Sequence, residues 1–187
     1  MTADTTTWSE VVEDPVFEMR MRFAQRDDGV SLVELWADPG GGVSVAHFHP
    51  KMEERFEVLE GEVTFTADKE EVVARPGDPP VVVKPGMRHT FRNTGSTEAH
   101  LMTEADPGDP DLQEFLTRAA ALARRGAYNR HGIPKSPGYL LEAAEFAERY
   151  RDSTVLTGPA FPPPGLQPLL LGPLARLHRW RVKRAAR

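Results

Sequence analysis

The stretch "GGVSVAHFHPKMEERFEVLEGEV", residues 41–63, places two of the six histidines on alternate positions of an apolar segment. Side chains two residues apart lie on the same face of a strand, so His47 and His49 share a face. Glu54 shares a face with apolar residues of the strand that follows. Two imidazoles and a carboxylate brought together form part of a site for a first-row transition metal. A third imidazole must come from elsewhere in the chain.

A second stretch, "KPGMRHTFRN" (residues 84–93), offers that imidazole. His89 follows a Pro-Gly turn and alternates with Phe91 and Asn93. This alternation again indicates a strand that presents every second side chain to one face. We therefore expect His89 to join His47, His49 and Glu54.

The two stretches together resemble the paired sequence motifs of the cupin superfamily. The first motif is Gly, five residues, His-x-His, three or four residues, Glu, six residues and Gly, and residues 41–61 match it at every position. The second motif is matched in spacing by Gly86, His89 and Asn93. Lys84 stands where this motif has a proline, and the upstream glycine, Gly77, is one residue too far away. These departures affect turn geometry and remove no ligand.

The resemblance implies a mainly β protein, a cupin-type antiparallel jelly-roll barrel with one metal site. It implies that His47, His49, Glu54 and His89 hold one divalent transition-metal ion. Iron, manganese, zinc and nickel all remain open as the metal. Some cupins have lost their metal, but such losses usually show as missing ligands, and here all four ligand residues are present.

Composition divides the chain into three parts. Residues 1–14 are expected to be a flexible N-terminal segment. Residues 15–106 consist of short strands separated by Gly- and Pro-containing turns, which is typical of an antiparallel sandwich or barrel. Residues 107–187 form a helical and Pro-rich extension. We expect this extension to pack on the barrel, because its apolar faces are narrow and alanine-rich and cannot bury a core alone.

Apolar periodicity in the extension predicts two helices, over residues 112–125 and about 137–151, and a third from about residue 172. Asp109 is the expected cap of the first helix, and Gly126 its end. The stretch between the first two helices is longer than a helix-turn-helix allows. The second helix is also acidic, so we do not expect the protein to bind nucleic acid.

The absence of cysteine excludes disulfides, thiolate ligands and cysteine nucleophiles. The N-terminus has no secretory signal pattern, and no apolar run approaches the roughly 20 residues of a membrane span. We therefore expect a cytoplasmic protein.

The His-x-Asp/Glu motif of 2-oxoglutarate-dependent oxygenases, His-Glu-x-x-His and Gly-x-Ser-x-Gly are all missing. These absences argue against those oxygenases, zinc peptidases and serine hydrolases of that type.

The resemblance leaves the activity open. We favour a metal-dependent, dioxygenase-like enzyme that acts on a small organic molecule. A metal-dependent isomerase or cyclase and a non-catalytic small-molecule-binding cupin are the alternatives. Glu54 is the expected proton acceptor, because a carboxylate ligand that loosens from its metal can act as a base. The candidate walls of a substrate pocket are Phe56, Phe65, Phe91 and Met102, although for each side chain taken alone a place in the barrel core is the safer interpretation.

Partners other than the small molecule are expected to be few. The strand Phe17–Phe23 has one apolar face, which favours either a homodimer contact or an inner strand of a monomer.

Residues 168–187 carry a net charge of +6, which leaves −11 on the rest of the chain. We expect this basic tail to dock on the acidic body of its own chain and not on a membrane.

Overall fold

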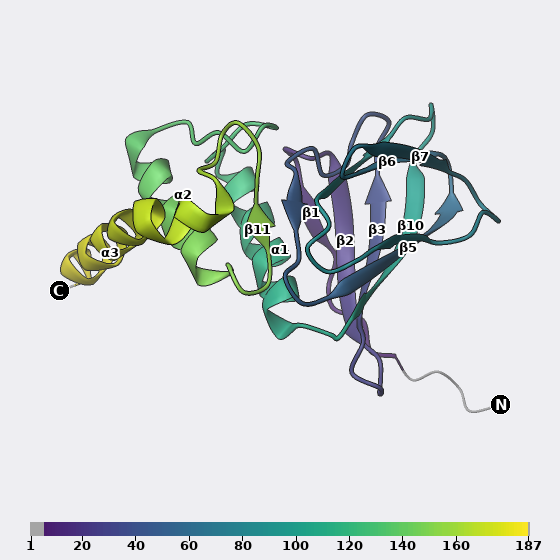
Figure 1. Cartoon of the computed structure of the whole chain (residues 1–187), viewed down its shortest axis with the longest axis horizontal. Helices are drawn as coiled ribbons and strands as arrows, with labels where there is room; N and C mark the ends of the chain where they lie inside the picture. The colour runs from purple at the N-terminus through teal and green to yellow at the C-terminus, as the bar shows by residue number, and fades with distance from the viewer. Residues whose placement is uncertain (1–5, 187) are drawn as a thin grey trace.

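The computed structural model describes residues 6–186, and it shows two antiparallel sheets followed by a group of helices (Figure 1). The strands are β1 (Val12–Asp14), β2 (Met19–Gln25), β3 (Ser31–Ala37), β4 (His47–Phe48), β5 (Glu53–Glu60), β6 (Val63–Ala67), β7 (Glu70–Ala74), β8 (Val81–Val83), β9 (His89–Asn93), β10 (Ala99–Asp106) and β11 (Val155–Leu156). Sheet A has the order β1-β2-β3-β10-β5-β8, and sheet B has the order β11-β4-β9-β6-β7.

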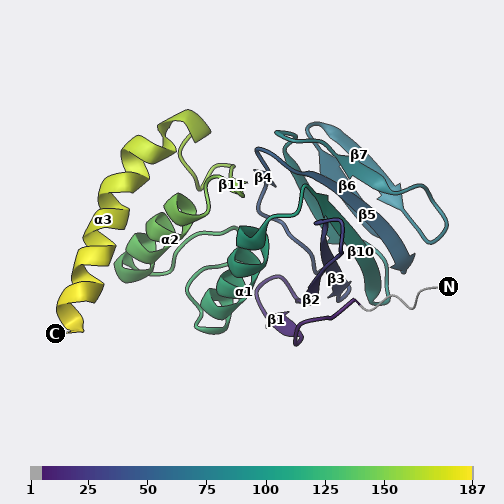
Figure 2. The same ribbon diagram turned by 90° about the horizontal axis from the view of Figure 1, so that it is seen from below.

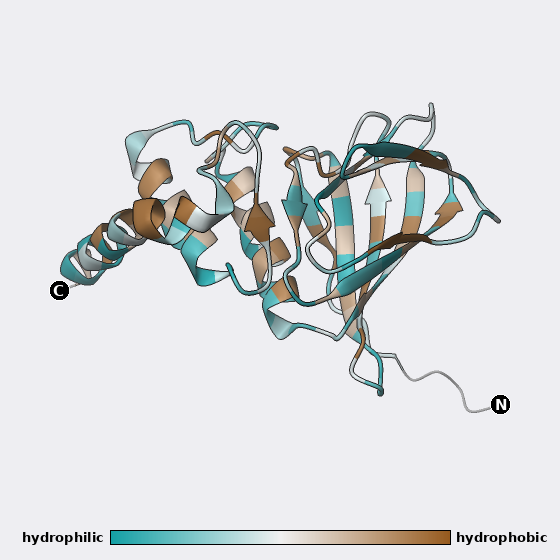
Figure 3. Ribbon diagram, viewed as in Figure 1, coloured by the Kyte–Doolittle hydropathy of each residue, from teal (hydrophilic) through white to brown (hydrophobic). Residues whose placement is uncertain are grey.

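Alternating side chains explain why these segments form strands around one core. In β2, Met19, Met21 and Phe23 are buried, whereas Arg20 and Arg22 lie on the outer face. Strand β10 buries every second residue in the same way, and Figure 3 shows apolar and polar residues interleaved along the strands of sheet A. Burying one face of each sheet against the other removes the apolar side chains from water, which is the main favourable term in folding.

Strand β2 lies between β1 and β3 and pairs with both. Its backbone edges are therefore not free to pair with a second copy of the chain, and dimerisation stays a prediction. The β-rich region starts at Val12, three residues before the expected boundary, because Val12–Asp14 pairs with Met19–Met21. Residues 1–5 of the N-terminal segment lie outside the described part of the chain.

The helices of the extension are α1 (Pro110–Arg124), α2 (Pro137–Arg149), the short 3₁₀ helix η1 (Pro164–Leu166) and α3 (Gln167–Ala185). They lie in sequence order beside the sheets, with α1 nearest and α3 farthest (Figure 2). The side chain of Asp109 caps α1, and Ser136 caps α2, which explains where both helices begin. Among the described residues no helix is long and apolar enough to cross a bilayer.

The basic tail contacts its own chain through small residues and not through its arginines. Helix α3 packs against α2, with Gly172 and Ala175 buried. Within residues 6–186, no ion pair joins a basic side chain of α3 to another element. The expected docking of the tail on its own chain is thus seen at the acidic helix α2, and a contribution from the charges of the arginines stays a prediction. Close packing of helices at small side chains supports the contact.

After α2 the chain returns to the sheets and adds a strand beside the predicted ligand histidines. Strand β11 pairs with β4, so that Leu156 lies opposite His47. Beyond the strand, the backbone N–H of Thr157 donates to the carbonyl oxygen of Ala46 at 2.7 Å. The extension is thus part of sheet B itself.

The turn before His89 shows why the loss of the motif proline at Lys84 is tolerated. The backbone N–H of Met87 donates to the carbonyl of Lys84 at 3.0 Å, and Gly86 has a φ of 78°. Proline at the second position and glycine at the third suit a type II turn, and Pro85 and Gly86 supply both. The N–H of Gly86 also donates to the carbonyl of His49 at 2.8 Å, which ties this turn to the first motif.

Gly61, the last residue of the first motif, provides a test of the packing between strands. It has a φ of 79°, and a Cβ atom there would lie 2.9 Å from Cα of Ala99. Gly61→Ala should lower the free energy of unfolding by about 2–4 kcal/mol, from backbone strain and the clash together. Gly126→Ala is the matched control, because its φ is 67° but nothing lies within 4 Å of the added atom. Its expected cost is about 1 kcal/mol. If denaturant titrations show that both variants lose the same free energy of unfolding, close packing at Gly61 is contradicted.

Candidate metal centre and adjoining cavity

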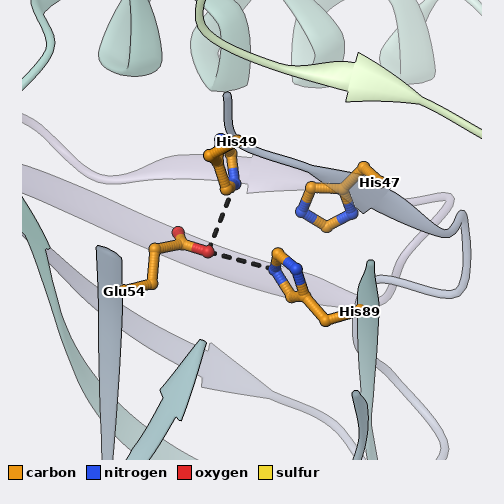
Figure 4. A group of neighbouring side chains, drawn as sticks. All are labelled: His47, His49, Glu54 and His89. Atoms are coloured by element: carbon orange, nitrogen blue, oxygen red, sulfur yellow. Dashed lines mark ion pairs between the residues drawn. The ribbon is translucent and has the colours of Figure 1, made fainter. Parts of the chain in front are cut away.

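The four residues predicted as metal ligands lie together at the end of the two sheets that faces the helices (Figure 4). His47 belongs to β4, His49 follows it directly, Glu54 belongs to β5 and His89 to β9. Their ligand atoms all lie within 4.8 Å of one another, and all four residues are buried. The group can hold a metal ion.

Backbone carbonyl groups fix the orientation of the three imidazole rings. Each ring uses Nδ1 to donate to a carbonyl oxygen, which can only accept, so the neutral ring carries its lone pair on Nε2. Outer hydrogen bonds of this kind accompany nearly all metal-binding histidines. The bonds are His47 to Val45 (3.0 Å), His49 to Ser153 (2.9 Å) and His89 to Met87 (3.2 Å).

The inner ends of the side chains meet at one carboxylate oxygen. Oε2 of Glu54 lies 3.2 Å from Nε2 of His49 and 3.0 Å from Nε2 of His89. Nε2 of His49 and Oε2 of Glu54 nevertheless have no hydrogen bond of acceptable geometry, although both are buried. Lone pairs that face one another in this way need a cation or a proton between them. The donor set therefore fits a metal ion.

Burial and mutual charge shift the pKa values of the cluster. Burial, reinforced by His89 and His49, lowers the pKa of His47 well below 6.5, so this ring is neutral at neutral pH. Burial also opposes the charged forms of His49 and Glu54, but the attraction between the two outweighs it. This attraction raises the pKa of His49 and, with His89, lowers the pKa of Glu54 well below 4.5.

The helical extension contributes the outer partners of His49. Besides the carbonyl of Ser153, the hydroxyl of Thr154 lies 3.3 Å from Nδ1 of His49. Both residues lie between α2 and β11, more than a hundred positions away in sequence. Sequence reasoning missed them, and no local signal marks Ser153, because its contribution is a main-chain carbonyl that any residue would have.

An apolar cavity of about 110 Å³ lies between the two sheets and the helices α1 and α2. His47 is the one member of the metal cluster that lines it. The lining is otherwise apolar or aromatic except at Asp14 and the two tyrosines, Tyr128 and Tyr139. A cavity that is mostly apolar, with a few polar groups, is typical of small-molecule binding sites.

The phenylalanines expected to line the pocket lie in the core between the sheets. Phe56, Phe65 and Phe91 are buried and pack on one another with ring centroids 5.2–6.0 Å apart. The ring centroids of Phe56 and His89 are 6.1 Å apart, so Phe56 lies beside the cluster. The cavity touches the cluster at His47 instead, and none of the three lines it.

Met102 lies apart from those three phenylalanines. On β10, Leu101 and Thr103 are buried, and Met102 between them pairs with Glu34 and Glu57. Neighbouring residues of a strand point to opposite faces, so Met102 is on the outer face of sheet A. His100 is on this face too, where it stacks on Trp36 and bonds to Glu34 at 2.9 Å.

Comparison with known proteins identifies the family. The family model of the Cupin domain matches residues 35–103. The chain is also 34% identical, over 109 residues, to a protein of Streptomyces cyaneus named polyketide synthase CurC. That similarity covers 54% of this chain and 70% of the relative. The chain belongs to the cupin superfamily.

Solved structures of low sequence identity are similar to parts of the chain. An RmlC-like cupin from Shewanella frigidimarina has 22% identity and a TM-score of 0.47, covering 60% of this chain and 93% of its own. KdgF from a Halomonas species has 17% identity and a TM-score of 0.46, covering 57% and 90%. A variant of Streptomyces PAC13 with uridine has 19% identity and a TM-score of 0.45, covering 56% and 80%.

The shifted pKa values predict how the stability of the metal-free protein changes with pH. A raised folded-state pKa means that protonated His49 stabilises the fold below 6.5, and that this contribution is lost as the pH rises through the folded pKa. The free energy of unfolding, measured with a chelator present, should therefore fall above pH 6.5. Glu54→Gln removes the charge that raises the pKa of His49, so the fall should shrink. A fall of equal size in both proteins would contradict this coupling.

Proposed function

We propose that the four-residue cluster binds one divalent transition-metal ion and that the protein is a metal-dependent enzyme acting on a small organic molecule. Nε2 of His47, His49 and His89 and a carboxylate oxygen of Glu54 are the proposed ligands. Three neutral imidazoles and one carboxylate leave a net charge of +1 around a divalent ion. Four protein ligands leave one or two coordination positions for substrate or water. The orphaned buried atoms of His49 and Glu54 are the support for this assignment.

Single substitutions test the ligand set. His47→Ala, His49→Ala and His89→Ala should each lose nearly all bound metal on dialysis, and Glu54→Ala somewhat less. Each substitution removes one of the four proposed ligands. His100→Ala is the matched control, because His100 is a partly buried histidine bonded to Glu34 outside the cluster. Elemental analysis of untagged protein measures the metal content. Full occupancy in His49→Ala would overturn the assignment.

The proposed substrate is a carbon chain with several ketone groups, which the enzyme closes into a ring. The cavity that shares His47 with the cluster is the observation that carries this proposal, because its apolar walls suit a carbon skeleton placed next to the metal ligands. The similarity to a protein named polyketide synthase supports the same substrate class. The cavity of about 110 Å³ is somewhat smaller than the apolar cavity of roughly 150 Å³ that holds benzene, so it would take no more than a single small ring.

Ring closure of this kind is an intramolecular aldol condensation. A divalent ion at the cluster would polarise a ketone oxygen and so acidify the carbon next to it. Glu54, as the carboxylate of the cluster, takes the proton from that carbon. The carbon then forms a bond to a second ketone carbon, whose oxygen receives the proton. Loss of water from the new alcohol gives the unsaturated ring, and no oxidant is consumed.

Oxygenation of a phenolic or enolic substrate is the second candidate. The observation that favours it is the ligand set itself, because three histidines and one glutamate resemble the donors of oxygen-using cupins. The two reactions differ in what they consume. Ring closure needs no oxygen and releases water, whereas a dioxygenase takes up one oxygen molecule per turnover.

A synthetic linear triketo ester, incubated with protein loaded with zinc or iron, separates the two. If ring closure is correct, mass spectrometry finds a product lighter by one water under argon, and Glu54→Gln abolishes it while His100→Ala does not. Oxygen uptake by the iron-loaded protein, with no product under argon, would favour the oxygenase instead. Absence of product under both conditions would contradict both enzymes.

A further inference from the structure

The carboxyl group of Asp14 is buried in the wall of the cavity, although most of the surrounding side chains are apolar. Asp14 ends strand β1 and is 2% exposed. Its Oδ1 accepts hydrogen bonds from the backbone N–H groups of Val16 (2.9 Å) and Phe17 (3.0 Å). These two bonds form the turn between β1 and β2. They use only one of the two carboxyl oxygens.

The second oxygen, Oδ2, has one distant donor among residues 6–186. The hydroxyl of Tyr128 lies 3.4 Å away, at the long end of the hydrogen-bond range. That hydroxyl donates its one proton to the carbonyl oxygen of Ala119 at 2.9 Å, which can only accept. Oδ2 of Asp14 therefore competes with a nearer acceptor for the single proton of Tyr128, and its hydrogen bond to that hydroxyl is weak. A donor from a bound molecule would satisfy the buried carboxylate.

Asp14 and the metal cluster lie near opposite ends of helix α1. At the C-terminal end, Arg124 donates to the carbonyl of Glu13 at 2.6 Å, which holds β1 there. At the N-terminal end, the charge of Asp109 contributes to the raised pKa of His49. Figure 2 likewise shows β1 and β4 apart along the side of the sheets that faces α1. The cavity, which touches both Asp14 and His47, thus has a polar group toward each end.

We propose that Oδ2 of Asp14 accepts a hydrogen bond from a phenolic or enolic hydroxyl of the ligand and so orients a single ring in the cavity, with its other side toward His47. This assignment rests on the proposed function and names its substrate class more closely: a ring or ring precursor that carries a hydroxyl away from the reacting ketone. A role in the turn alone does not account for an aspartate at this buried position, because an asparagine Oδ1 would accept the same two backbone bonds.

Binding of phenol and of anisole, its methyl ether, tests the proposal. Both are single rings with one oxygen, but only phenol can donate to Asp14. Wild-type protein should prefer phenol by about tenfold, the usual effect of one hydrogen bond to a charged group. In Asp14→Asn the group facing the ligand becomes an amide that donates equally well to either oxygen, so the preference should fall to within about threefold. Ligand titrations followed by NMR, with methionine methyl groups labelled, give both affinities.

Two matched controls accompany the test. Asp28→Asn changes an exposed aspartate whose side chain also accepts from a backbone N–H two residues on, and Tyr139→Phe removes the other tyrosine hydroxyl of the cavity, which donates to the carbonyl of Arg125. Both should keep the wild-type preference. Contacts from phenol to the methyl groups of Met19 and Met21 should place the ring in the cavity, since both residues line it.

An unchanged preference in a folded Asp14→Asn variant would overturn the proposal, as would phenol that fails to contact those methionines. The titrations are made with zinc-loaded protein and repeated with a chelator, and the preference should persist in both. This readout does not depend on turnover. Ring closure with an unchanged preference would therefore sink only the role of Asp14, whereas an intact preference without any product would sink only the proposed reaction.

Discussion

The hydrogen bond from Nδ1 of His49 to the carbonyl oxygen of Ser153 is the contact on which the candidate site depends most. It fixes which nitrogen of His49 is free, and it joins residues 104 positions apart. Ser153 is held in place because the next residues pair with β4 and because α2 packs on α1 before them. The geometry of one ring in the two-sheet body is thus set by the helical extension, and the two parts form one functional unit.

The metal cluster could be predicted from the sequence because its information is local. The alternation of a strand places His47 and His49 on one face, and motif spacing adds Glu54 and His89 without knowledge of the rest of the fold. Met102 shows where such reasoning fails. Both Leu101 and Met102 are apolar, so the alternation of β10 does not reveal which of the two faces the core, and the structure buries Leu101.

The cavity could not be predicted, because its walls come from segments far apart in the chain. Met21 on β2, Phe115 on α1 and Phe146 on α2 line it together, yet each has the apolar spacing of an ordinary core residue. Nothing in a single segment separates a side chain that faces a cavity from one that packs against its neighbours. The polar exception, Asp14, falls in the N-terminal segment that the sequence predicts to be flexible, and the structure places it in a turn that uses only one of its carboxyl oxygens.

The same separation between His49 and Ser153 has a consequence for the order of events during synthesis of the chain. At roughly 5–20 residues per second, the 104 positions between them correspond to about 5–20 s of translation. His89 and the strands up to Asp106 are made during that interval, and for the rest of it the ring of His49 still lacks its outer partner. The ligand set is complete early, but the orientation of its rings is not. The candidate metal cluster therefore reaches its final geometry only after Ser153 has been made.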